Sequence, residues 1–176
     1  LKGNYRGSLD NMYADLQLVS SDGNATVKDT MKNFSSQQTA VYDLAVTTDN
    51  IDLGKLLQDT SIGKITAKVK VKGKGFDVKT AKADYNVHVE EAGYNGYNYR
   101  EIDVRGNIDN NTYQADLNSA DPNLGIKGNY FLNLNPGQMS FKTNTSISYV
   151  DLRALGLTSD SFDIRADITA DVPMLD

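Results

Sequence analysis

His88 is the single histidine of the 176-residue chain, and it lies between Asp84 and Glu90 in an alternating segment. A histidine beside carboxylates can transfer protons near neutral pH or bind a metal ion. Here the three side chains share the polar side of a regular polar and apolar alternation, which is typical of a solvent-facing strand. We therefore expect neither a catalytic residue nor a metal ligand at His88.

Other motifs that could carry chemistry are incomplete. The alternation of Asn and Asp after Asn107 resembles a calcium-binding loop, but Thr112 stands where such a loop needs Gly and Asn118 where it needs Glu. A hairpin turn explains it better. The chain has no Cys, which excludes a thiolate nucleophile and a Cys-based metal site. We predict a protein that is not an enzyme and needs no cofactor.

The composition points away from helices. The chain has 20 Asp against 3 Glu, together with 17 Asn and 14 Gly. Asp, Asn and Gly disfavour helix interiors and favour turns. The net charge of −5 argues against a nucleic-acid partner, whose binders need clustered positive charge. No apolar run is long enough for a spanning helix, and the chain starts at Leu1 without a signal peptide.

Alternation with a period of two dominates the sequence. Between Lys64 and Lys72 every second residue is apolar and every other one is Lys or Thr, so the two sets lie on opposite faces of a strand. Similar runs follow along the whole chain and are separated by short turns rich in Asp, Asn, Gly and Pro. Strands joined so briefly pair antiparallel. The sequence predicts an all-β fold, a long antiparallel meander of about a dozen strands.

Two leucine-rich segments interrupt this alternation. Residues 50–57 and 150–157 place leucines at helical spacing after Asp52 and Asp151, which could cap a helix, so each predicts a helical turn or two. The two Asp residues are 99 positions apart. Other features recur at the same offset, including Ile65 to Val69 against Ile164 to Ile168. We interpret this as an internal duplication, with units of approximately residues 1–99 and 100–176 and the second unit truncated, in a fragment of a larger repetitive protein.

The apolar face of such a meander needs a cover, because a buried aliphatic side chain is worth about 1.5–3 kcal/mol. Four arrangements would supply one: a two-sheet sandwich, a closed barrel, a membrane barrel, or a single U-shaped sheet whose apolar face lines a half-pipe. Repetition along one axis favours the half-pipe. Alternation assigns the following residues to its apolar lining: Ile65, Val69, Val71, Tyr85, Val87, Val89, Ile102, Val104, Leu117, Ile126, Tyr130, Leu132, Phe141, Ile147, Ile164 and Ile168.

The order of several motifs resembles the repetitive β-rich region of AsmA/TamB-like envelope proteins, in the version found in Bacteroidetes-type Gram-negative bacteria. The likeness extends over nearly the whole chain. It rests on the segments Tyr42 to Val46, Asp52 to Leu57, Gly63 to Ala67, Val71 to Asp77, Tyr94 to Tyr97, Asp121 to Leu124 and Asp151 to Leu155.

The resemblance implies a periplasmic protein that is anchored in the inner membrane outside this chain. It implies a hydrophobic groove that shields phospholipid acyl chains on their way to the outer membrane. Two alternatives stay open. One is a scaffold that captures outer-membrane β-barrel clients by strand addition, and the other is a surface adhesin built as a glycan-binding β-sandwich.

Overall fold

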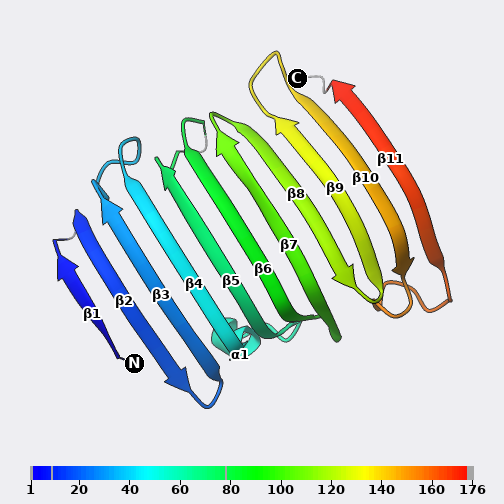
Figure 1. Ribbon diagram of the computed structural model, residues 1–176, viewed down its shortest axis with the longest axis horizontal. Helices are drawn as coiled ribbons and strands as arrows, with labels where there is room; N and C mark the ends of the chain where they lie inside the picture. Colours follow the sequence, from blue (N-terminus) through cyan, green and yellow to red (C-terminus); the bar gives the residue numbers. More distant parts are fainter. Residues whose placement is uncertain (1, 9, 78, 174–176) are drawn as a thin grey trace.

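The computed structural model describes residues 2–8, 10–77 and 79–173, and these form one antiparallel sheet of eleven strands (Figure 1). Every strand pairs with its neighbours in sequence, so the order in the sheet equals the order along the chain. The strands are β1 (Lys2–Gly7), β2 (Asn11–Ser20), β3 (Gly23–Lys32), β4 (Val41–Asp52), β5 (Ile62–Lys74), β6 (Lys82–Tyr94), β7 (Tyr97–Asp109), β8 (Thr112–Asp121), β9 (Leu124–Asn133), β10 (Ser140–Asp151) and β11 (Asp163–Pro173).

The predicted fold class is confirmed. The described residues build an all-β meander in a single layer, which is neither closed into a barrel nor packed as a two-sheet sandwich. The strands curve along their length, as Figure 1 shows, so the sheet is not flat. Its two outer strands are β1 and β11, each of which pairs with one neighbour within the described part of the chain.

Asn residues explain how the chain turns so tightly between long strands. Asn110 and Asn111, between β7 and β8, both have positive φ, 48° and 64°. Asn95 and Gly96 do the same between β6 and β7, with φ of 48° and 80°. Two successive residues with positive φ form the turn whose twist matches an antiparallel hairpin, and Asn and Gly adopt it most readily. The segment that resembled a calcium loop is therefore a hairpin.

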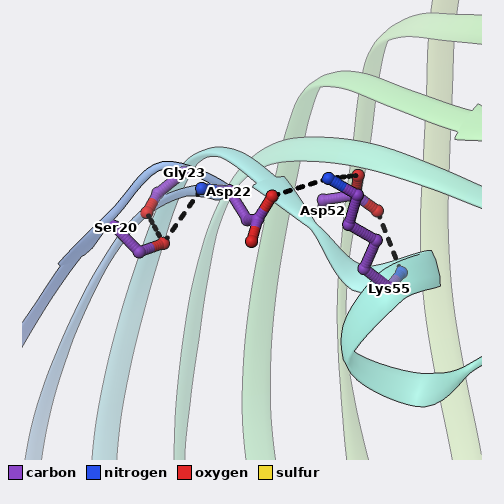
Figure 2. A network of polar contacts seen from close by, with 5 residues as sticks. All are labelled: Ser20, Asp22, Gly23, Asp52 and Lys55. Atoms are coloured by element: carbon purple, nitrogen blue, oxygen red, sulfur yellow. Dashed lines mark hydrogen bonds and ion pairs between the residues drawn. The ribbon is translucent and has the colours of Figure 1, made fainter.

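The first leucine segment forms the short helix α1 (Leu53–Leu57) after β4. This helix is attached to the β2–β3 hairpin, because the Asp52 amide donates to the Asp22 carbonyl oxygen at 2.7 Å. Figure 2 shows that the Asp52 side chain accepts from the Lys55 amide, at 3.0 Å, and that the Lys55 side chain reaches Asp22. Lys55 Nζ also lies 2.7 Å from Asp22 Oδ1, and this pairing raises the pKa of the exposed lysine. Gly54 is required here, because a Cβ would lie 2.0 Å from the Ile62 carbonyl oxygen.

The second leucine segment forms hydrogen-bonded turns instead of a helix. The Asp151 side chain accepts from the Ala154 amide at 2.9 Å, as Asp52 does in the first segment. The register also shifts just before each segment, between Thr48 and Ile51 in β4 and between Ile147 and Val150 in β10, again 99 positions apart. These parallels agree with an internal duplication, which stays a prediction.

A single-layer sheet buries little of its apolar surface completely. None of the large side chains in the described ranges is fully buried, and the most buried apolar residues are small ones or lie at the strand ends. No helix among the residues described is long and apolar enough to span a membrane. The apolar side chains of the strands therefore form a half-buried face, which is the first place to look for a binding surface.

Candidate apolar binding surface

One row of side chains crosses all the strands from β2 to β11 on the same face. The cross-strand register puts Val69 opposite Val46 and Val87, and Val87 opposite Val104. Residues directly opposite each other in an antiparallel pair point to the same face. We call this series the central row; it consists of Leu16, Val27, Val46, Val69, Val87, Val104, Leu117, Gly128, Thr145 and Ile168.

All sixteen residues assigned by alternation lie on the face of the central row, which we call the apolar face. Five of them are in the central row itself: Val69, Val87, Val104, Leu117 and Ile168. The adjoining row toward α1 contains Val89, Ile102, Ile126 and Ile147, and beyond it Ile65 and Ile164 face Ile51 and Val150. On the other side of the central row lie Val71, Tyr85 and Tyr130, and then Leu132 and Phe141.

The apolar face is bordered at both ends of its strands. At the α1 end, Ile51 and Val150 are 3% and 5% exposed, and Leu155 from the second leucine segment is 3% exposed. At the opposite end, Tyr42 stacks on Phe76 with ring centroids 5.3 Å apart, and Phe34 contacts the edge of Phe76 at 5.8 Å. Between these borders most of the larger aliphatic side chains are half-buried, so apolar surface faces outward.

The apolar character of the face weakens toward β9 and β10. The buried hydroxyls of Thr143 and Thr145 lie 2.7 Å apart on this face, and they form a hydrogen bond with each other.

The Tyr85 side chain lies over Gly106 on the same face, where a Cβ on Gly106 would come within 2.6 Å of the Tyr85 hydroxyl. The Tyr85 hydroxyl donates to the Gln114 carbonyl oxygen at 2.8 Å. Burial raises the pKa of Tyr85, so the phenol stays neutral and its ring extends the apolar surface.

The opposite face is charged and hydrated. Lys64, Lys68, Lys70, Lys72 and Lys74 are exposed along β5. His88 Nδ1 lies 2.9 Å from Asp103 Oδ1 on β7, so its partner is a neighbouring strand's carboxylate rather than Asp84 or Glu90. Within the described ranges, no three His or acidic side chains are grouped closely enough to hold a metal ion. This face has the polar character that the alternation predicts.

Asp29 on β3 is a charged residue of the apolar face that alternation did not assign. It belongs to the apolar face, because it stands opposite Ala14 and Leu44 and shares its strand face with Val27 and Met31. Its Oδ1 atom is buried without a hydrogen-bond partner. Burial, followed by repulsion from Asp43, raises the pKa of the Asp29 carboxyl. The sequence contains a signal for this site, because Asp29 occupies a position of β3 at which the alternation calls for an apolar residue.

Asp121 shows what a buried carboxylate looks like when its hydrogen bonds are complete. It is 3% exposed and accepts from the Tyr97 hydroxyl at 2.6 Å and from the amides of Arg100 and Asn123, both at 2.8 Å. Asp29 lacks such partners at Oδ1. Asp121 therefore stabilises the strand end, whereas an ionised Asp29 costs stability.

We expect Asp29→Asn to raise the free energy of unfolding by about 1 kcal/mol at pH 7. This is the lower end of the usual cost of a buried polar group without a hydrogen-bond partner, because Asp29 is only half-buried. A raised native pKa means that the native state binds this proton more tightly than the unfolded chain. Below pH 4 Asp29 is protonated and does not destabilise the native state. As the pH rises through the native pKa, Asp29 ionises and the free energy of unfolding falls. Urea unfolding at pH 7 and below pH 4 measures both.

Asp84→Asn is the matched control, because Asp84 is exposed on the polar face of β6. It should change stability much less than Asp29→Asn at pH 7. A gain at Asp29 that is equally large below pH 4 would show that the charge is not its source.

No protein-family model, curated protein or solved structure matches the chain. The apolar face itself is therefore the basis for a functional argument.

Proposed function

We propose that the chain is a periplasmic segment that shields phospholipid acyl chains on its apolar face during transport between the inner and outer membranes. The observation that carries the proposal is the central row. It runs from β2 to β11 on one face, and its eight aliphatic side chains are left half-buried or exposed by the rest of the described chain, whereas Gly128 and Thr145 on β9 and β10 are buried. Water contact with so many aliphatic side chains is unfavourable, and an apolar ligand would relieve it.

The shape of the row fits an extended, featureless ligand. Strands are spaced by about 4.8 Å, so the nine spacings from β2 to β11 extend for roughly 43 Å. The acyl chains of one membrane leaflet cover about 15 Å, half of the hydrocarbon core. Several acyl chains could therefore lie along the row, and the repetition of Val and Leu from β2 to β8 gives each similar contacts there. Such a surface allows movement along it, since no single position binds much more tightly than the next.

The polar face supports the same function, because it keeps the segment hydrated while the apolar face is covered. The order of motifs in this chain resembles that of AsmA/TamB-like envelope proteins, and lipid transport is the activity that this resemblance implies.

Native mass spectrometry after incubation with phosphatidylethanolamine and phosphatidylglycerol vesicles tests the proposed lipid binding. We expect protein ions that carry one or more phospholipids. A chain that stays free of lipid at every vesicle concentration would contradict the proposal.

The sheet edges favour a second candidate, a scaffold for outer-membrane β-barrel clients. The outer edge of β11 offers an eleven-residue strand whose free side is unpaired within the described chain. An extended client segment could add to it through backbone hydrogen bonds. Crosslinking from β11 to a β-barrel client, in a preparation that contains no lipid, would favour this candidate. The adhesin alternative required two packed sheets, and the described residues form only one.

A further inference from the structure

The polar face contains a cleft that the lipid proposal leaves without a role. Two hollows of about 460 Å³ and 400 Å³ lie side by side over β7 to β11. Both are lined by Asp116, Asn129 and Asn144, so they form one continuous cleft. It runs across the strands from Asp171 on β11 to Asp103 on β7. We call it the polar cleft.

One aromatic ring of the polar face, that of Phe131, lines the larger of the two hollows. The register puts Phe131 on β9 opposite Gln114 on β8 and Lys142 on β10, which places its side chain on the polar face. Its neighbour Tyr130 points to the apolar face instead. A half-buried phenyl ring among amides and charged groups costs hydration without joining the apolar face. It provides an apolar contact among polar side chains.

The charges around the polar cleft cancel. Its carboxylates come from Asp103, Asp116 and Asp171, and its cations from Arg105, Lys127 and Lys142. Lys142 Nζ and Asp171 Oδ2 are already paired at 2.9 Å. A polyanion would be attracted by the cations and repelled as strongly by the carboxylates, so this charge balance favours an uncharged ligand. The amides of Asn129, Asn144 and Gln114 add both donors and acceptors.

We propose that the polar cleft binds a neutral oligosaccharide that lies across the strands. A pyranose ring presents C–H groups that pack on an aromatic face, while its hydroxyls exchange hydrogen bonds with amides and carboxylates. One sugar residue is about as long as one strand spacing, roughly 5 Å, so successive rings would lie over successive strands. The cleft crosses β7 to β11 and accommodates about four rings at that spacing. This site is separate from the apolar face and does not depend on lipid binding.

A titration of the chain with cellotetraose, followed by amide NMR shifts, tests the proposal. We expect millimolar or tighter binding, with shifts centred on the strands around Phe131, and a loss of about tenfold in affinity for Phe131→Ala. Phe141→Ala is the matched control, because Phe141 lies one strand away on the apolar face, opposite Leu132. It should leave the affinity for cellotetraose unchanged.

Asn144→Ala provides a second variant in case the loss of the ring disturbs the sheet, since Asn144 is exposed and lines both hollows. It should also weaken cellotetraose binding. The proposal is overturned if no amide shifts occur at millimolar cellotetraose, or if Phe131→Ala and Phe141→Ala weaken binding equally. Tighter binding of the anionic polygalacturonate than of cellotetraose would likewise overturn it, because it would identify a charged ligand.

Discussion

Val87→Asp should lower the phospholipid occupancy of the chain, because the affinity for an acyl chain that crosses β6 falls by about tenfold, which corresponds to losing the roughly 1.5 kcal/mol of one aliphatic contact. Val87 lies in the central row between Val69 and Val104. A carboxylate there would be desolvated by any acyl chain that crosses β6, and it would interrupt the row at its middle. Native mass spectrometry with equal vesicle concentrations gives the occupancy.

Asn86→Asp is the matched control for this change. Asn86 is the adjacent residue on β6, but it is exposed on the opposite face and stands between Lys70 and Arg105, so a new carboxylate there meets two cations. It should leave lipid occupancy unchanged. His88 is a poorer control, because an acidic residue there would face Asp103.

Val87→Thr separates lipid binding from folding. Thr has nearly the shape of Val and suits a strand, yet it adds a hydroxyl to the row. It should lower occupancy less than Val87→Asp does, with an unchanged far-ultraviolet circular dichroism spectrum. Equal occupancy in the wild type, Val87→Asp and Asn86→Asp would show that the apolar face does not hold the lipid.

Leu155→Ala should lower the free energy of unfolding by about 2–5 kcal/mol, the usual cost of truncating a buried leucine. Leu155 is 3% exposed in the turns that follow β10, where its amide donates to the Asp151 carbonyl oxygen at 3.1 Å. Because the sheet has few fully buried side chains, each one contributes a large share of the stability. Equilibrium unfolding in urea measures the change.

Leu157→Ala belongs to the same segment and serves as its control, since Leu157 is 63% exposed. It should change the free energy of unfolding by less than about 0.5 kcal/mol. If the two variants were equally stable, the second leucine segment would not hold the end of the sheet.

Much of this fold could be predicted from the sequence, because alternation and short turns are local properties. The period of two in β5 specified both faces of that strand, and Asn-rich turns such as Asn110-Asn111 required an antiparallel neighbour. Once consecutive strands pair in order, every apolar set falls on one face. The sixteen assigned residues lie together for that reason.

Other features depend on contacts that the local pattern does not contain. The local pattern sets Asp29 between Val27 and Met31, but its cross-strand neighbours Ala14 and Leu44 are known only from the register. The polar cleft requires the register of five strands before Phe131 and Asn144 come together. The second leucine segment carries the same capping Asp as the first but folds as turns, a difference that the local pattern does not contain.

Strict pairing between sequence neighbours also determines how such a sheet can assemble. Each strand from β1 to β11 pairs only with strands next to it in the sequence, so its partners are never distant in the chain. Proteins dominated by short-range contacts fold faster than other β proteins, since each loop closure costs little entropy. Each new hairpin can therefore add to a finished edge as soon as its strand is available. A meander of this kind can fold progressively from one end during synthesis or export, and lengthening it adds steps without raising the largest barrier.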